Sequence, residues 1–387
     1  MNDQNLIYLD ANSTTPVLPE IWDAMRPFAL TQFGNPSSSH GAGRKSRKAL
    51  EDCREEIANL LGAFPDEVVF TSGATEANNL ALHSALSDCS SSIVASQIEH
   101  SSITEHLKKL EKQGFYLQWL DTDPQGKASL ANLSDKIKPD TKLATLMLVN
   151  HETGVLQPIE TLGNQLQSKM WVHTDAVQAA GKIRINFHRL CVTSLALSAH
   201  KFHGPKGIGA LLVRRGSTLK PMLFGGHQQK SLRPGTEPVP LVVGMALALK
   251  LAMNNLEARR NKVAQLRESF LLELRKVVAD FTINGEDNPM LPFTLNLGFP
   301  GLKADILLMR LDMAGVACST GSACSSGSLL PSPVLMAMQV SPEVLKSSMR
   351  FSFGFHLEEA EAIEGAKRIA HAVQSLRNHA NTNEKFV

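Results

Sequence analysis

The feature that most constrains the fold of this chain is a regular alternation of short apolar segments with segments of helical periodicity. Strand-like apolar runs occur at residues 68–70, 93–95, 143–149, 170–173, 195–197 and 210–213. Between them, the segments 74–86, 102–112 and 161–168 carry apolar residues at helical spacing. Strands that alternate with helices in this way predict an α/β fold, in which helices cover both faces of a mostly parallel sheet.

Polar residues follow the first five of these strands where each one ends. In chain order they are the segment T-S-G-A-T, His100, Asn150, Asp175 with Gln178, and His200 with Lys201. In open α/β sheets, ligands bind outside the carboxyl ends of the strands. A single His or Asp in such a place is more often structural, but five strand ends together predict one functional site.

Lys201 lies in the segment S-A-H-K-F-H-G-P-K-G-I-G, directly after the fifth strand. The glycines and the proline that follow it predict a loop and exclude a helix there. A lysine that is held among histidines, with apolar walls on both sides, has the surroundings that lower an amine pKa for Schiff-base chemistry. On composition alone a solvated loop lysine is the better reading, and only the other strand ends reverse it.

The composition describes an ordinary globular protein and excludes some partners. The chain has 387 residues, enough for a large domain with a smaller companion, and a formal net charge of +2 with no basic run. Nucleic acid is therefore not an expected partner. The N-terminal segment lacks the pattern of a signal or transit peptide, and no window has the ~18 apolar residues of a membrane span. We expect a cytoplasmic protein that does not bind membranes.

The five cysteines do not form a recognisable framework. Their number is odd, their spacing is scattered and no C-x-x-C pair occurs, so the sequence indicates neither a disulfide network nor a zinc site, and we expect no metal. Cys324 differs from the others because it lies in the Gly- and Ser-rich segment G-S-A-C-S-S-G-S. An accessible thiol in such a segment suits a cysteine nucleophile that must move, although a spare thiol on a linker is the alternative.

The pattern of helical and strand-like segments changes after residue 240. Two helical segments, 241–251 and 256–278, lead to strand-like runs at 293–297 and 349–353 and to further helical segments at 303–313 and 358–380. This order predicts a smaller α+β domain. We assign residues 16–250 to the large domain, and residues 1–15 and 251–387 to the small one. Arg350 lies on a strand of the small domain, where it is either a carboxylate-binding residue or a surface residue.

The strand-end residues together meet the needs of pyridoxal phosphate. Ala74 and Thr75 begin a helix after Gly73, and free N–H groups at a helix N-terminus bind phosphate. Lys201 can form the Schiff base, Asp175 can pair with the ring nitrogen, and His100 can stack on the ring. The chain contains no Walker A loop, and G-P-K-G-I-G does not have the spacing of a dinucleotide motif.

The motifs resemble the class V pyridoxal-phosphate enzymes, and among them the cysteine desulfurases of the NifS/IscS type. The resemblance runs along nearly the whole chain, through Y-L-D-A-N-S-T-T-P, F-T-S-G-A-T-E, E-H-S-S, H-T-D-A-V-Q, S-A-H-K-F-H-G-P-K-G-I-G, R-P-G-T-E, G-S-A-C and S-S-M-R-F-S. It implies a fold-type I transferase with a seven-stranded sheet. It also implies removal of sulfur from L-cysteine, which gives L-alanine and a persulfide on Cys324 for an acceptor protein such as an iron–sulfur scaffold.

The resemblance also implies a role for each site residue. Catalysis would depend on Cys324 as nucleophile, on Lys201 as the lysine that carries the cofactor, and on His100 as proton shuttle. The substrate carboxylate would bind Asn150 and Arg350. The cofactor would be bound by Ala74, Thr75, Asn150, Asp175, Gln178, Ser198, His200 and Lys201, and by Thr236 of a partner subunit, which implies a homodimer.

The chain departs from the pattern of this family at two places. His151 stands where the family has a second Asn, and His227, Gln229, Lys230 and Ser231 replace the usual residues before Thr236. The first departure could alter contacts near the cofactor, and the second could retune the dimer contact. Three other functions remain open: a selenocysteine lyase, because P-S-P-V-L is also found in that group, another class V enzyme such as an aminotransferase, and an inactive sulfur-transfer scaffold.

Overall fold

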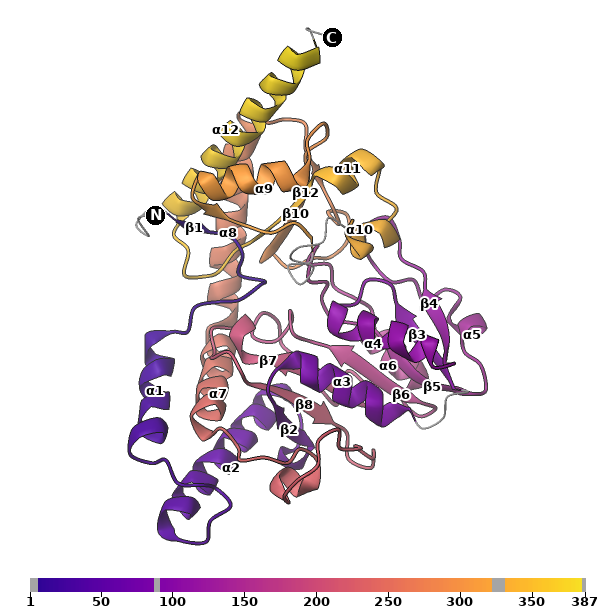
Figure 1. The fold of residues 1–387 in the computed structure, drawn as a ribbon, viewed down its shortest axis with the longest axis vertical. Helices are drawn as coiled ribbons and strands as arrows, with labels where there is room; N and C mark the ends of the chain where they lie inside the picture. Colours follow the sequence, from indigo (N-terminus) through magenta and orange to yellow (C-terminus); the bar gives the residue numbers. More distant parts are fainter. Residues whose placement is uncertain (1–5, 87–90, 322–330, 385–387) are drawn as a thin grey trace.

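The computed structural model describes residues 6–86, 91–321 and 331–384 of the chain, with side chains to residue 379. The elements gather in two parts (Figure 1). The lower part in that view holds a large sheet with its helices, and the upper part holds smaller sheets together with the C-terminal helix. The N-terminal strand lies with the upper part, next to elements from the other end of the chain.

The large sheet has seven strands and confirms the predicted α/β architecture. Six strands run in one direction, and only β8 is antiparallel to its two neighbours. From edge to edge the order is β2 (Val68–Thr71), β8 (Gly209–Val213), β7 (Ser194–Ser198), β6 (Trp171–Asp175), β5 (Thr141–Thr145), β3 (Ser92–Ser96) and β4 (Tyr116–Leu120).

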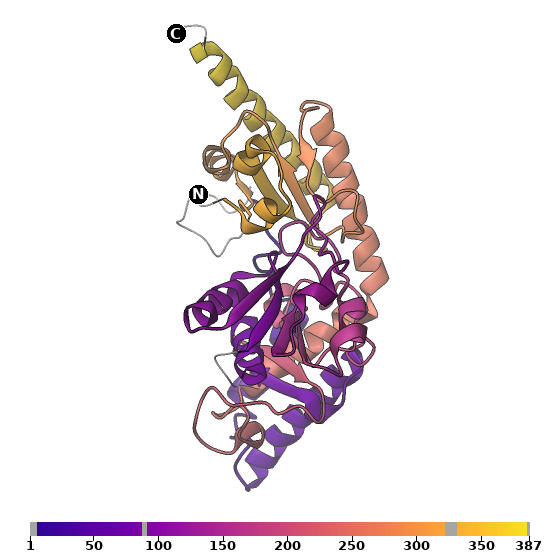
Figure 2. The same ribbon diagram turned by 90° about the vertical axis from the view of Figure 1, so that its right-hand side faces the viewer.

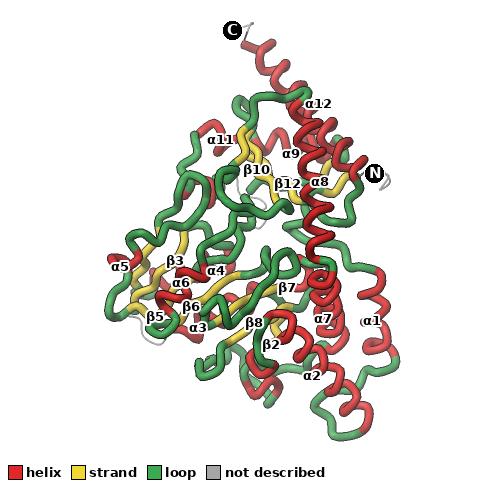
Figure 3. The backbone as a smooth tube through the Cα atoms, turned by 180° about the vertical axis from the view of Figure 1, so that it is seen from behind, coloured by secondary structure: helices red, strands yellow, loops and turns green. Residues whose placement is uncertain are grey.

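Helices cover both faces of this sheet because successive strand residues point to opposite sides. On one face, Val69 and Ala196 pack against Leu80 of α3 (Ala74–Ala85), and α4 (Ser101–Lys112) lies beside α3. On the other face, the alternate residues Phe70 and Leu195 belong to a larger core. That core is closed by α2 (Gly41–Leu61), α6 (Ile159–Leu166) and α7 (Val239–Asn254), with α1 (Pro19–Leu30) on the outer side of α7 (Figure 3).

The second part is built on a three-stranded antiparallel sheet. Its order is β12 (Ser348–Ser352), β10 (Thr294–Gly298) and β9 (Thr282–Ile283), and it is covered by α8 (Leu256–Arg275), α9 (Ala304–Met313) and α12 (Glu359–Glu384). Phe270 of α8 packs with the rings of Phe351 and Phe353 at 5.7 and 5.3 Å. Near this sheet, β1 (Ile7–Tyr8) pairs with β11 (Val316–Ala317).

Helices α7 and α8 connect the two parts. They meet at Asn255 with a bend of 74°, and α8 runs along one side of the molecule (Figure 2). In the described part of the chain no single helix is long and apolar enough to cross a membrane, and this bent pair meets the length and composition criteria only when its two helices are taken together.

The structure corrects several predicted elements. Helix α1 and edge strand β4 were not predicted, since α1 contains Pro27 and β4 is only partly buried. Helix α2 begins at Gly41, where the His40 side chain caps it by accepting from the Gly43 N–H. Strand β5 ends at Thr145, short of the predicted residue 149, although the N–H groups of Leu146 and Leu148 still donate to carbonyls of β6.

Candidate active site

The predicted strand-end residues do meet at one edge of the large sheet. Asp175 is the last residue of β6, and Ser198 is the last residue of β7. His200 and Lys201 follow Ser198 in a single turn of 3₁₀ helix, η3 (Ala199–Lys201), where the sequence predicted a loop. One helical turn fits before the glycines because the N–H groups of Phe202 and Gly204 both donate to the Ala199 carbonyl oxygen.

The Lys201 amine is aimed at the N-terminal segment that crosses this edge. Its Nζ donates to the carbonyl oxygens of Asn12 at 2.6 Å and Ser13 at 2.8 Å. Its neighbour His200 lies 3.1 Å from the Thr14 hydroxyl. Burial, and then the positive charge of Lys201, lowers the pKa of His200 to about 4, so this ring is neutral at pH 7.

Asp175 is buried, and both of its carboxylate oxygens accept hydrogen bonds. Oδ1 accepts from the Val177 N–H at 2.9 Å, and Oδ2 accepts from Asn78 Nδ2 at 2.8 Å. The side-chain oxygen Oδ1 of Asn78 lies 3.0 Å from Nε2 of His173, and burial lowers the pKa of this histidine to about 3. Sequence reasoning missed Asn78, although a polar residue among the apolar positions of α3 was a usable signal.

The N-terminus of α3 and the end of β7 form a backbone cradle. A Cβ placed on Gly73 would lie 3.8 Å from Ser198 Oγ, so the two segments are close. A Cβ on Gly209 would come within 2.8 Å of the Gly73 backbone, which explains why a glycine stands there. The first N–H groups of a helix lack intrahelical partners, so Ala74 and Thr75 present donors beside the Ser198 hydroxyl.

Gln178 lies between this edge and the N-terminal segment. Its Nε2 donates to the Asn12 carbonyl oxygen at 3.0 Å, and its Oε1 accepts from Lys182 Nζ at 2.8 Å. Lys182 also donates to Asn12 Oδ1 at 3.1 Å. The sequence analysis did not identify Asn12, because nothing in the pattern of its segment places it near Gln178. It also gave no role to Lys182, although this residue follows Gln178 by four positions.

Asn150 is fully buried, and the protein itself uses both ends of its amide. Its Oδ1 accepts from the N–H groups of Glu152 and Thr153, each at 2.9 Å, and its Nδ2 donates to the Ile98 carbonyl at 3.1 Å. The residue therefore holds a tight turn, and its role in binding cofactor and substrate stays a prediction. The next residue, His151, contacts the ring of His100 edge-on at 5.4 Å.

Arg350 reaches the site from the small sheet. It is 2% exposed on β12, and its guanidinium contacts Asp10 Oδ1 at 2.9 Å, Ser13 Oγ at 2.8 Å and the His151 carbonyl at 3.2 Å. Its position excludes the surface role that the sequence left open. Since Lys201 donates to the carbonyl of the same Ser13, the two cations meet at one residue.

Two predicted residues stay untested. Cys324 lies outside the described residues. Thr236 is exposed on the segment before α7. An ion pair of Arg233 with Glu76, at 2.8 Å, ties this segment to α3. A role of Thr236 in a partner subunit stays a prediction.

The residues at this edge fit pyridoxal phosphate. The Lys201 amine can bind its aldehyde carbon, the Asp175 carboxylate can pair with the ring nitrogen, and the N–H groups of α3 with Ser198 Oγ can hold its phosphate. These groups come from three different segments and still lie at one sheet edge. His100, which caps α4 through Nδ1, lies at the same edge.

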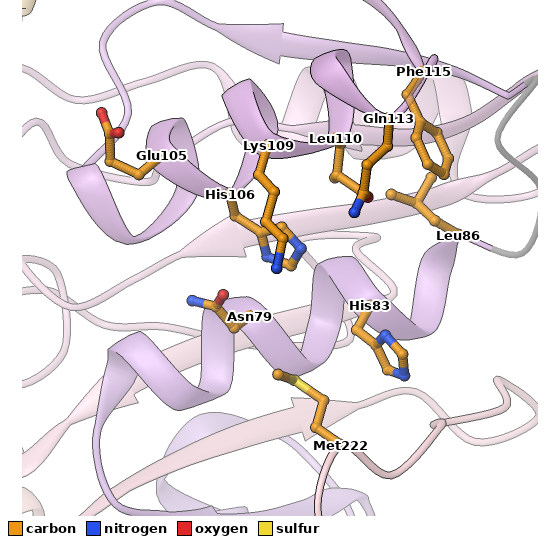
Figure 4. Close-up of a pocket in the computed structure, with 10 residues that line it drawn as sticks. All are labelled: Asn79, His83, Leu86, Glu105, His106, Lys109, Leu110, Gln113, Phe115 and Met222. Carbon is orange, nitrogen blue, oxygen red and sulfur yellow. The ribbon is translucent and has the colours of Figure 1, made fainter.

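A separate surface pocket lies between α3 and α4 (Figure 4). His106 and Lys109 of α4 point toward α3, which contributes Asn79 and His83, and Met222 lies at the opposite rim. None of the predicted site residues lines it. This pocket is therefore not the candidate active site.

Comparisons with known proteins agree with this assignment. A family model described as Aminotransferase class-V matches residues 7–364. The cysteine desulfurase IscS of Dictyoglomus turgidum is 39% identical over 375 residues, which are 96% of this chain and 95% of that protein. A solved structure described as a NifS-like protein is 32% identical, with a TM-score of 0.88 over 95% of this chain and 99% of its own.

A second solved structure, described as SspA in complex with cysteine, is 34% identical. Its TM-score is 0.79 over 90% of this chain and 98% of its own. The seven-stranded sheet and these structural neighbours confirm the predicted fold-type I architecture. The chain therefore belongs to the aminotransferase class-V family of pyridoxal-phosphate enzymes, and within that family to the group of the cysteine desulfurases.

Proposed function

We propose that this protein is a cysteine desulfurase, which takes sulfur from L-cysteine, releases L-alanine and keeps the sulfur as a persulfide on Cys324. The observation that carries the proposal is the convergence of Lys201 and Arg350 on Ser13. In this arrangement the Lys201 amine, which would bind the cofactor, lies near an arginine that can bind the carboxylate of an amino acid. The relatives named as cysteine desulfurases, and the neighbour described in complex with cysteine, support this substrate.

Bound pyridoxal phosphate supplies an electron sink that weakens bonds of the amino acid. The residues of this chain do the remaining work. Asp175, whose oxygens accept hydrogen bonds from Asn78 and Val177, would pair with the ring nitrogen and stabilise a proton there. Arg350 orients the substrate by binding the carboxylate of the substrate. The nitrogens of Lys201 and His100 then exchange protons with the substrate.

Cys324 receives the sulfur in this proposal. Its thiol first gives up a proton, because the thiolate is the nucleophile. The thiolate attacks the substrate sulfur, so that one S–S bond forms while the C–S bond of cysteine breaks and its carbon takes up a proton. Cysteine and a thiol thus become alanine and a persulfide, and no outside oxidant or reductant is needed.

The proposal includes a homodimer and a protein that accepts the sulfur, for example an iron–sulfur scaffold in the cytoplasm. The exposed position of Thr236 leaves its hydroxyl accessible to a second chain, which supports the dimer. Analytical sedimentation of the protein with bound pyridoxal phosphate tests the dimer. A mass of two chains, together with weaker cofactor binding in Thr236→Ala, is the expected result.

Incubation with L-cysteine, followed by the intact mass of the protein, tests the central reaction. We expect the wild type to gain the mass of one sulfur atom and release one alanine, and Cys324→Ser to do neither. Cys318→Ser is the control and should behave as the wild type. Full alanine release by Cys324→Ser would favour another class V activity, and a strong preference for selenocysteine would favour a lyase. A protein with no cofactor band and no added mass would be an inactive scaffold.

A further inference from the structure

We propose that Lys182 is a positioning residue, which sets the orientation of the Gln178 amide so that its nitrogen faces the cofactor site. Nothing in the sequence pattern or in the proposed reaction assigns a task to this lysine. It is 6% exposed, Gln178 is 5% exposed, and Asn12, which contacts both, is 1% exposed. The inference rests on cofactor binding and on the predicted contact of Gln178 with the ring hydroxyl of the cofactor.

The chemistry of the groups determines the direction of the amide. An ammonium group has donors only, so the end of Gln178 that faces Lys182 at 2.8 Å has to be the oxygen Oε1. The other end, Nε2, then donates to the Asn12 carbonyl at 3.0 Å. Turning the amide over would set its NH₂ against the ammonium and its oxygen against a carbonyl, so both contacts would become repulsive.

The amide nitrogen is held next to the cofactor lysine. The carbonyl oxygen of Asn12 accepts from Gln178 Nε2 and also from Lys201 Nζ at 2.6 Å. Because two donors share one acceptor, a group bound to Lys201 meets the NH₂ end of Gln178 and not its oxygen. A negatively charged ring oxygen needs this donor.

Lys182 is well placed to remain in this role. A second hydrogen bond to Asn12 Oδ1 at 3.1 Å ties Lys182 to the N-terminal segment, and its ammonium lies 5.5 Å from the centre of the Phe293 ring.

The charge of Lys182 depends on its surroundings. Burial, and then the charges of Lys201 and Arg350, lowers the pKa of Lys182 to about 7. The ring of His203 is a further group in this field, and its own pKa is lowered to about 3.

Titration of the apoprotein with pyridoxal phosphate at pH 6, where Lys182 is charged, tests the inference. We expect Lys182→Met to raise the dissociation constant for pyridoxal phosphate about tenfold, which is the usual effect of losing a hydrogen bond to a charged group. The absorption band of the bound cofactor should also shift. Gln178→Ala should show the same two changes. The double variant should bind no worse than Gln178→Ala, because Lys182 acts through that residue.

Lys136→Met is the matched control. Lys136 has a side chain 19% exposed and pairs with Asp121 at 3.2 Å, far from the site, so its loss should leave the band and the affinity unchanged. Wild-type affinity in Lys182→Met, or effects of the two single variants that add in the double variant, would overturn the inference.

A further variant keeps the test informative if Lys182→Met does not fold. Gln178→Glu retains an acceptor for Lys182 but has no donor, so it should bind the cofactor at least as weakly as Gln178→Ala. Wild-type affinity in Gln178→Glu would contradict the need for a donor. None of these measurements uses L-cysteine, so a protein that passes them and leaves cysteine intact refutes the proposed function alone.

Discussion

Arg350 and Asp10 form a buried ion pair, with 2.9 Å between Nη2 and Oδ1. The pair joins β12 to the N-terminal segment, whose backbone forms a bridge at Asp10 with Ser352. The two side chains are 3% and 16% exposed, and among the described residues Nε of Arg350 has no hydrogen-bond partner. The guanidinium is thus held in one orientation while one of its donors stays available.

We expect Arg350→Lys to raise the KM for L-cysteine by tenfold or more, because a lysine is a point charge and cannot replace the planar fork of donors. Steady-state release of alanine measures the effect. Arg310→Lys, on α9, is the control and should leave the KM unchanged. An unchanged KM in Arg350→Lys would mean that this arginine serves only the ion pair with Asp10.

Asn78→Ala should weaken cofactor binding and lower the free energy of unfolding by about 1–3 kcal/mol. The change leaves Oδ2 of Asp175 and Nε2 of His173 without their partner inside the core. Urea unfolding and titration with pyridoxal phosphate measure the two effects. Asn79→Ala, at the next and less buried position of α3, should have a smaller effect on both. Equal effects of the two variants would argue against a special role of Asn78.

Glu99→Gln should change how stability depends on pH. Burial, and then the negative charge of Asp175, raises the pKa of Glu99 to about 8 from its usual 4.5. Between these two values the folded protein binds more protons than the unfolded chain, so stability falls as the pH rises, by up to about 1.4 kcal/mol per pH unit. The amide removes this loss and can still accept from the Met147 N–H.

Urea unfolding of the apoprotein at pH 5 and pH 8 checks this expectation. The wild type should lose more stability between the two values than Glu99→Gln. Glu105→Gln, at an exposed ion pair on α4, should follow the wild type. Parallel curves for the wild type and Glu99→Gln would show that Glu99 is ionised in the folded protein.

Gln229→Ala should lower the free energy of unfolding by about 1–2 kcal/mol. The Gln229 amide accepts from the Phe70 N–H at 2.7 Å and donates to the Phe70 carbonyl at 2.9 Å, so it caps the outer edge of β2. Thermal unfolding of the apoprotein measures the loss. In contrast, Ser231→Gly should retain or raise stability, because Ser231 has a left-handed backbone with φ of +63°. A loss in Ser231→Gly as large as that in Gln229→Ala would contradict this reading.

Much of the candidate site was predictable because strand ends are local features of a sequence. Asp175, Ser198 and Lys201 follow apolar runs whose carboxyl ends must share an edge if the sheet is parallel. The helix start at Ala74 was likewise visible from Gly73. Helix α1 was missed because its internal proline, Pro27, is a residue that usually ends or kinks a helix.

The α/β class, the edge of the sheet that carries the site and the family could all be predicted from the amino-acid sequence. Which side chains lie behind that edge became clear only from the folded chain. Asn78 contacts His173 and Asp175, and Asn12 contacts Lys182, so these contacts join residues 95–170 positions apart in the chain. Periodicity reports which face of an element is buried, whereas a hydrogen bond between distant segments depends on how the segments cross. The meeting of Lys201 with Arg350 at Ser13 is therefore a property of the folded chain.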